Sequence, residues 1–236
     1  RVMYNYRNVF DKESGFMRGR LKDGSWLAPF DPYEWGGPYC EGNAWHYNWS
    51  VFHDVQGLIN LYGSDEAFTA KIDSVFTVPN VIRPGTYGGM IHEMKEMELA
   101  GMGQYAHGNE PSHHMAYLYN WTDSPWKGQG YLDYIMQNFY TNEPDGIIGN
   151  EDCGQMSAWY VMSALGFYQV SPGIPVYTLG RPMVNKASMH VKGGIFEIVA
   201  TNNSPANKYV KEVKLNGKVL ETPFISHSDI INGGKL

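Results

Sequence analysis

Residues 149–166 read GNEDCGQMSAWYVMSALG, and this stretch indicates how the chain around it folds. Glu151 and Asp152 stand in a glycine-rich turn, ahead of a predicted helix whose free N–H groups favour negative charge. Gly166 ends that helix, because glycine adopts a left-handed conformation without Cβ strain. Capping alone explains such carboxylates, so the neighbouring motifs decide whether the turn is functional. The helix is marked by apolar side chains at helical spacing, namely Met156, Trp159, Tyr160, Met162 and Leu165.

Helical spacing also recurs before this turn. The segments that show it are 1–12 (the tail of a helix), 51–62, 64–76, 90–99, 111–121 and 125–139. Long loops rich in glycine, acidic and aromatic residues join them, the longest at 13–42. Loops of that length inside a compact domain are usually functional. Paired helices with such loops are typical of a helical toroid.

After Gly166 the pattern becomes that of β-strands. Residues 195–199 read IFEIV, and Asn216-Gly217 between two short apolar runs is typical of a hairpin with a type I′ turn. We therefore predict a mainly α fold with a β-rich C-terminal part. The boundary is expected near residue 175, with a β-sandwich beginning after it.

Composition narrows the classes of function. Hydrophobic residues make up 43% of the chain and charged residues 18%, which excludes a disordered chain. The net charge of −6 without a basic cluster argues against nucleic acid as a partner, and no apolar run is long enough to cross a membrane. Cys40 and Cys153 are too few for a disulfide framework or a zinc site, and we expect two buried thiols behind a pocket. The sequence starts and stops inside patterned segments, so we expect a fragment.

Four acidic stretches lie between the predicted helices. They read CEGNAW at 40–45, HEMKEM at 92–97, HGNEPSHH at 107–114 and NED at 150–152. Such a grouping fits a reaction with two carboxyl groups on opposite faces of a substrate, as in glycoside hydrolysis. One group would be held protonated and the other ionised. Hard oxygen donors among them suit Ca²⁺, and the 17 tyrosines and 7 tryptophans suit a pocket that stacks on a ligand.

Structural interpretations of the same stretches stay open. His92 and Glu93 fit the capping and bracing of a helix equally well. His113 and His114 follow a proline in a first turn, where facing the core is commoner than binding zinc. HEMKE resembles the zinc-binding HExxH helix, but Glu96 occupies the place of the second histidine, which disfavours a metalloprotease.

Several long motifs, in order, resemble glycoside hydrolase family 92. They are EGNAWHYNW at 41–49, HEM at 92–94, GQYAHGNEPSHH at 103–114 and GNEDCGQMSAWYVMSALGFYQVSPG at 149–173. The likeness covers most of residues 1–185, and beyond that it rests on the β-rich tail. The family comprises calcium-dependent, inverting, exo-acting α-mannosidases. The resemblance therefore implies Ca²⁺ as cofactor and mannose-containing glycans as substrates, with N-glycan degradation as a setting.

The resemblance also implies an architecture. The family has an N-terminal β-sandwich domain, an (α/α)6 barrel catalytic domain and further β-sheet sequence from its C-terminal end. Residues 1–175 are then expected to be part of the (α/α)6 barrel, and residues 176–236 the start of the C-terminal β-sandwich region. The N-terminal domain, missing here, is expected to pack against this chain. The usual setting of the family is a bacterial enzyme that is exported to the periplasm, surface or medium.

Catalytic roles follow from the same resemblance. Glu41 in the EGN motif matches the general acid, and Asp152 matches the general base. Many members carry an aspartate two residues before the base, where this chain has Asn150, which we expect in the substrate site. The aromatic residues expected to stack on a sugar, or else to lie in the core, are Trp35, Trp45 and Tyr105.

Substrate linkage and metal ligands are expected from the remaining motifs. His92 and Glu93 match the positions that grip the leaving-group mannose in α-1,2-specific members, so we expect α-1,2 linkages. His46 stands where a glutamine is frequent, which leaves the linkage open. The calcium ligands we nominate are Glu93, Asn109 and Glu110.

Two other functions fit the residues. One is a different (α/α)6 inverting glycosidase, such as a glucoamylase-like enzyme, which would not need calcium. The other is a carbohydrate-binding fragment without catalysis, which would bind mannose without turnover. The fragment is also expected to be inactive alone if another domain supplies part of the pocket.

Overall fold

The computed structural model describes residues 2–236, and these form two compact units. The first unit consists of residues up to 115 together with 148–150, and the second of residues 116–147 and 151–236. The first unit is mainly helical, and most strands belong to the second, so the prediction of a mainly α fold with a β-rich C-terminal part is confirmed. The boundary at residue 175 and the (α/α)6 barrel stay predictions.

Helices, most of them short, and one small hairpin make up the first unit. The hairpin pairs β1 (Phe10–Asp11) with β2 (Phe16–Met17) in antiparallel register. The helices, with η for a 3-10 helix, are η1 (Val2–Tyr4), α1 (Tyr6–Val9), α2 (Ala44–Tyr47), α3 (Val55–Tyr62), α4 (Asp65–Thr77), η2 (Gly85–Tyr87), α5 (His92–Ala100) and η3 (Glu110–Ser112).

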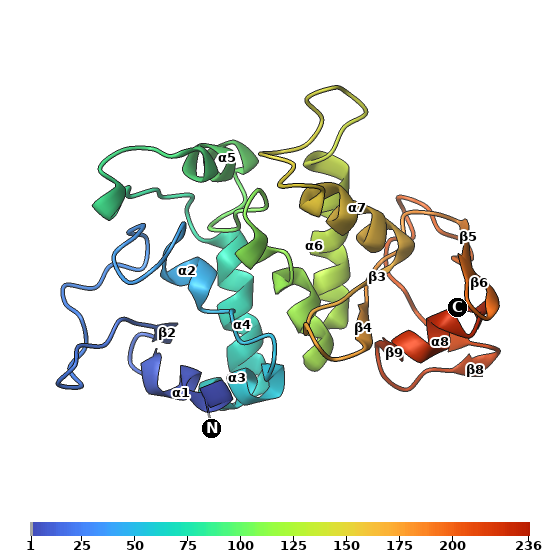
Figure 1. The fold of residues 1–236 in the computed structure, drawn as a ribbon, viewed down its shortest axis with the longest axis horizontal. Helices are drawn as coiled ribbons and strands as arrows, with labels where there is room; N and C mark the ends of the chain where they lie inside the picture. The colour runs from blue at the N-terminus through green and yellow to red at the C-terminus, as the bar shows by residue number, and fades with distance from the viewer. Residues whose placement is uncertain (1) are drawn as a thin grey trace. The chain divides into compact units, whose positions relative to one another are not determined.

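Local capping explains where α3 and α4 begin and end. The Asp54 carboxylate accepts a hydrogen bond from the Gly57 N–H, which starts α3 later than its apolar spacing predicts. Gly63 ends α3 in a left-handed conformation, and Ser64 caps α4 as predicted. The two helices pack against each other (Figure 1), and α4 buries one face against the core through Phe68, Thr69, Ile72, Val75 and Phe76.

The α-helix predicted over residues 111–121 is wrong. The chain instead forms η3, with Pro111 in its first turn, and then η4 (Met115–Trp121), a second 3-10 helix. Residues 115–119 are buried on all sides, so they lack the exposed face of an amphipathic helix. Tertiary packing decides the backbone of this segment. The helix predicted at residues 1–12 is likewise reduced to η1 and the four-residue α1.

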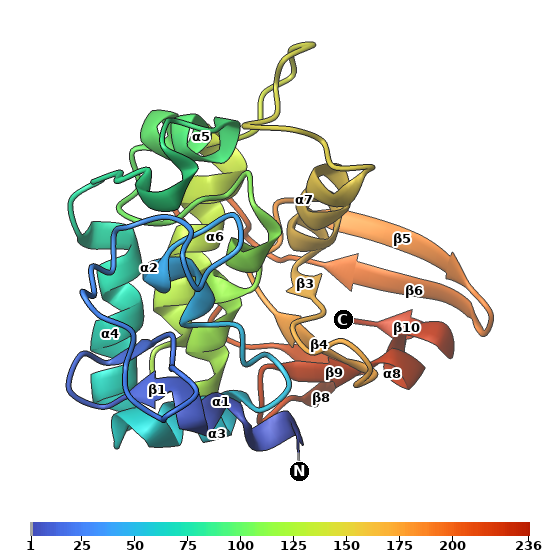
Figure 2. The same ribbon diagram turned by 60° about the vertical axis from the view of Figure 1, so that its left-hand side comes forward.

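The second unit combines two long helices with three small sheets. Its helices are α6 (Pro125–Asn138), α7 (Gln155–Leu165) and α8 (His227–Ile231). The strands are β3 (Phe167–Tyr168), β4 (Val176–Leu179), β5 (Lys186–Val191), β6 (Gly194–Val199), β7 (Lys214–Leu215), β8 (Lys218–Val219), β9 (Phe224–Ser226) and β10 (Gly234–Lys235). Their spatial orders are β10-β6-β5, β3-β4-β9 and β7-β8. Figure 2 shows the β5–β6 hairpin with β10 beside β6, to which β10 pairs in parallel.

One apolar core joins two of these sheets. It consists of Phe167, Leu179, Phe196, Ile198, Ile225 and Ile230, which come from both three-stranded sheets and α8. The predicted hairpin is confirmed, since Asn216 and Gly217 both have positive φ (51° and 83°) between the paired β7 and β8. Within residues 2–236 no helix has the length and apolarity that crossing a bilayer requires.

A buried ion pair braces the second unit. Arg181 Nη1 lies 3.2 Å from Asp133 Oδ1, and both side chains are almost fully buried. Replacing Arg181 with methionine is expected to lower the free energy of unfolding by about 3–5 kcal/mol, because the Asp133 charge stays buried without its partner. Urea unfolding of the whole protein measures this loss. Lys186→Met, which removes the exposed pair with Glu197, is the control and is expected to change little.

Candidate active site

Glu41 lies in an irregular turn that leads into α2, within the first unit. Its side chain is exposed, and its φ of 49° is left-handed, which is rare for a glutamate. The turn is closed by a hydrogen bond from the Gly36 N–H to the Gly42 carbonyl oxygen (3.0 Å). Gly36 must be glycine, because a Cβ there would come within 2.1 Å of Thr86 Oγ1 and its φ is also positive. The turn therefore presents the predicted acid to solvent.

A capping box fixes the start of α2 just after the turn. Asn43 accepts from the Trp45 N–H, and the Asn43 N–H donates to His46 Nδ1 (3.1 Å). Because Nδ1 accepts, the His46 proton is on Nε2, which donates to the Gln104 carbonyl oxygen (3.0 Å). Burial lowers the pKa of His46 to about 4, so the imidazole is neutral near pH 7. His46 is thus a structural support of α2 in this unit.

His92 and Glu93, the residues predicted to grip the leaving-group mannose, form a pair in the first turn of α5. His92 Nε2 lies 3.0 Å from Glu93 Oε1, and the histidine is exposed whereas the carboxylate is buried. The second carboxylate oxygen, Glu93 Oε2, is buried and has no hydrogen-bond partner among residues 2–236. A buried carboxylate oxygen of this kind can accept a hydrogen bond from water or from a ligand hydroxyl, or bind a cation.

Glu96 lies in the acidic stretch 92–97, but no role was predicted for it beyond the exclusion of a zinc site. It follows Glu93 by three positions on α5, so both carboxylates project from one side of that helix. The Glu96 side chain lies against the backbone of two motif glycines: a Cβ at Gly108 would be 2.3 Å, and at Gly149 2.6 Å, from Glu96 Oε2. The i, i+3 spacing with Glu93 is the signal that identifies it. The Glu96 side chain thus contacts both the HGNE motif, at Gly108, and the start of the GNED motif, at Gly149.

The other nominated metal ligands lie at the start of η3. Asn109 is buried and precedes η3, and its Nδ2 donates to the Glu41 carbonyl oxygen (2.6 Å), while Glu110 is exposed. The donor set, carboxylate and amide oxygens with the orphaned Glu93 Oε2, has the chemistry that Ca²⁺ prefers. Among residues 2–236 no three acidic, histidine or cysteine side chains converge on one point. Water, amide oxygens and substrate hydroxyls would have to complete the shell.

The predicted aromatic residues are all buried in this unit. Trp35 and Tyr105 have no exposed surface, which places them in the core, the alternative left open above. Trp45 is 6% exposed, and its ring meets the Phe16 ring edge-on with centroids 4.8 Å apart. Its stacking on a sugar stays a prediction.

The two histidines that follow Pro111 face the core, as the structural interpretation favours. His113 Nε2 lies 2.9 Å from the His107 carbonyl oxygen, and His114 Nε2 lies 2.7 Å from the Trp49 carbonyl oxygen. Burial lowers the pKa of His114 to about 4, so this imidazole is neutral near pH 7. Both rings therefore have backbone partners inside the unit.

Two neighbouring carboxylates before α7, in the second unit, have different surroundings. Glu151 accepts from the Ser157 N–H (3.0 Å) and the Ser157 hydroxyl (2.7 Å), and these hydrogen bonds lower the pKa of its carboxyl. Asp152 is exposed and takes no part in this cap, and its φ is 50°. Glu151 therefore explains the helix-capping pattern, which leaves Asp152 available for chemistry. Asn150, at the edge of the first unit, is also exposed.

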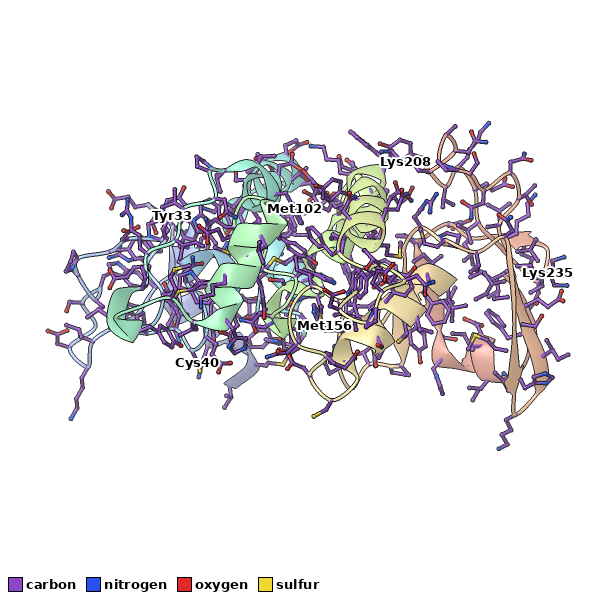
Figure 3. The ribbon with its side chains drawn as sticks, turned by 90° about the horizontal axis from the view of Figure 1, so that it is seen from above. Tyr33, Cys40, Met102, Met156, Lys208 and Lys235 are labelled. Carbon is purple, nitrogen blue, oxygen red and sulfur yellow. The ribbon has the colours of Figure 1, made fainter. Side chains whose placement is uncertain are left out.

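The prediction of two buried thiols is wrong. Cys40 and Cys153 are both free and exposed, and Figure 3 shows Cys40 at the edge of its unit. Both stand in turns beside a residue with positive φ, Glu41 or Asp152, and Cys153 itself has a φ of 57°. Such turns lie on the surface, where no core forms behind the sulfur.

The chain is similar to a known family and to solved structures. The sequence model of a family described as the glycosyl hydrolase family 92 catalytic domain matches residues 2–236. Among solved structures, the chain is similar to the family GH92 alpha-mannosidase BT3965 from Bacteroides thetaiotaomicron. The two are 40% identical with a TM-score of 0.85, and the match covers 98% of this chain and 28% of that one.

The chain is also similar to the family GH92 inverting mannosidase BT2199 from the same organism. They are 44% identical with a TM-score of 0.84, and the match covers 98% of this chain and 32% of that one. A curated relative, an uncharacterized secreted glycosidase from Arthroderma benhamiae, is 26% identical over 200 residues, which cover 83% of this chain and 23% of the relative. The chain therefore spans less than a third of the length of each of these relatives.

Proposed function

Because the chain belongs to glycoside hydrolase family 92, we propose that the protein carrying it removes terminal α-linked mannose from glycans with inversion of configuration. One observation supports this most. Among residues 2–236, two of the five non-glycine residues with positive φ are Glu41 and Asp152, the carboxylates that match the family's acid and base. Strained backbone concentrates at functional sites, and both side chains are exposed to meet a substrate.

Glu41 is the general acid of this proposal. Its carboxyl group donates a proton to the glycosidic oxygen as the bond to the anomeric carbon breaks, so the departing sugar leaves as a neutral alcohol. This role needs an accessible carboxyl group whose direction is fixed, and Glu41 projects from a turn closed by hydrogen bonds.

Asp152 is the general base. It accepts a proton from the water that attacks the anomeric carbon from the face opposite the leaving group, and the product has the inverted, β configuration. The base must stay ionised and unengaged until water arrives. Glu151 is already engaged, because its carboxylate accepts hydrogen bonds from the Ser157 N–H and hydroxyl. This supports the choice of Asp152 as the base.

His92 and Glu93 bind the leaving-group mannose, which implies α-1,2 linkages. The exposed imidazole and the buried Glu93 Oε2 would receive sugar hydroxyls. The same orphaned oxygen also fits a cation, so the ligands that we propose for Ca²⁺ are Glu93, Asn109 and Glu110. Bound Ca²⁺ would supply a hard Lewis acid for mannose hydroxyls.

Removal of calcium is expected to abolish mannose release by the whole protein from α-1,2-mannobiose. EDTA is also expected to lower the Tm, because a metal that binds only the folded protein stabilises it. Added Ca²⁺ should restore both, and NMR should show β-mannose as the first product. Full activity in EDTA would refute the calcium requirement. α-Mannose as the first product would refute the inverting mechanism. No release of mannose from any α-mannoside would refute the proposed activity.

Export from the cell completes the proposal. The Arthroderma benhamiae relative is described as a secreted glycosidase, which supports export. Export by a bacterium, to the periplasm, surface or medium, is the setting we propose.

A further inference from the structure

Side chains bind every backbone polar group of Cys40 and Glu41. The Cys40 N–H donates to the Tyr47 hydroxyl (3.2 Å), which donates in turn to the Cys40 carbonyl oxygen (2.6 Å). The Glu41 N–H donates to the Tyr87 hydroxyl (2.7 Å), and the Glu41 carbonyl oxygen accepts from Asn109 Nδ2 (2.6 Å). Backbone groups in a loop are commonly satisfied by water or by other backbone. Here three side chains from outside the turn satisfy all four.

These hydrogen bonds hold a strained residue. The left-handed conformation of Glu41, with φ of 49°, is unfavourable by about 1–2 kcal/mol for a residue with a Cβ. It persists only where the surroundings impose it. The backbone conformation sets the direction of the Cα–Cβ bond, so the contacts at the Glu41 N–H and carbonyl also set the direction in which the side chain leaves the turn.

Each tyrosine comes from a segment that is itself fixed. Tyr47 is the last residue of the capped helix α2, and Tyr87 is the last residue of η2. The η2 turn is joined to the segment before the acid: the Thr86 N–H donates to the Trp35 carbonyl oxygen (3.3 Å), and the Gly37 N–H donates to Thr86 Oγ1 (2.9 Å). The hydroxyls therefore reach the turn from anchored positions.

We propose that Tyr47, Tyr87 and Asn109 are positioning residues, which hold the acid turn so that the Glu41 carboxyl group is aimed at the glycosidic oxygen. The inference rests on the proposed role of Glu41 as general acid. Proton transfer needs donor and acceptor within hydrogen-bond reach, and a displacement of about 1 Å can lower the rate about 10²-fold. None of the three residues needs to touch the substrate for this role.

The test compares substrates by leaving group. Tyr87→Phe and Tyr47→Phe in the whole protein are expected to lower kcat on α-1,2-mannobiose by about 10- to 100-fold. KM is expected to stay within about twofold, since uniform binding is untouched. On 2,4-dinitrophenyl α-mannoside, whose leaving group departs without a proton, the same variants should stay within about threefold of the parent. If the tyrosines had a purely structural role, the variants would lose activity on both substrates to the same extent.

Control variants distinguish an effect on the acid turn from the general effect of removing a buried hydroxyl. Tyr62→Phe removes a hydroxyl that donates to the Gly15 carbonyl oxygen (3.0 Å) and accepts from Asn48 Nδ2 (2.6 Å), away from the acid turn. It is expected to show no dependence on leaving group. Asn109→Asp keeps an oxygen for a cation but cannot donate to Glu41, so it should behave like Tyr87→Phe while calcium still raises its Tm.

The outcomes distinguish this inference from the proposed function. If Glu41→Gln loses activity only on poor leaving groups but Tyr87→Phe and Tyr47→Phe lose none, the positioning role is refuted and the acid stands. Equal losses on both substrates in these variants would also refute it. If Glu41→Gln itself shows no dependence on leaving group, the acid assignment fails, and the positioning role fails with it.

Discussion

Glu41→Gln is expected to lower hydrolysis of α-1,2-mannobiose by about 10³-fold, the middle of the range for loss of a general acid. Glutamine has nearly the same shape but no proton to give at the glycosidic oxygen. The variant should also fold normally, because the Glu41 side chain is exposed and the turn is held through backbone groups. Initial rates and the Tm of the whole protein measure both effects.

An activated substrate provides the internal control for Glu41→Gln. Release of 2,4-dinitrophenolate needs no proton, so the loss on the dinitrophenyl mannoside should be far smaller than on the disaccharide. Near-normal turnover of mannobiose by this variant would show that the acid lies elsewhere.

Asp152→Asn is expected to lower hydrolysis by a similar factor of about 10³, but on every substrate. The attacking water must lose a proton whichever group departs, so an activated leaving group cannot compensate for the base. The loss is expected in kcat, since the amide still occupies the same place and binding of the sugar changes little. Rates on mannobiose and on the dinitrophenyl mannoside together measure it.

The adjacent residue gives a matched control for the base. Glu151→Gln alters a carboxylate one position away, whose hydrogen bonds go to Ser157. It is expected to weaken the start of α7 slightly and to keep kcat near the parent value. If Glu151→Gln lost activity while Asp152→Asn kept it, the two roles would have to be exchanged.

Features decided by neighbours in the chain could be predicted from sequence. Ser64 and Gly63 mark the junction of α3 and α4, and Asn216-Gly217 marks the β7–β8 hairpin, because capping and turn conformation depend on a few adjacent residues. The η3–η4 segment could not, since its backbone follows from burial on all sides. Periodicity shows which residues are apolar, and it does not show what surrounds them.

The site divides in the same way. The motifs singled out Glu41 and Asp152 as the predicted acid and base, and only the structure shows that Glu151 accepts from the Ser157 N–H while Asp152 is exposed. Glu96 was missed because its contact with Gly108 and Gly149 joins segments distant in the chain. The cysteines were misplaced because residue type favours burial, whereas the turns that carry them lie at the surface.

The left-handed backbone at Glu41 means that stability of the fold and the proposed proton donation favour different residues at this position. Asparagine or glycine would adopt the same φ more readily, so replacing the proposed acid by either residue is expected to stabilise the folded protein. In the proposed mechanism, selection for turnover keeps a glutamate there, and relaxed selection should let this position drift first. A relative with asparagine or glycine at this place is then best interpreted as one that binds sugar without cleaving it.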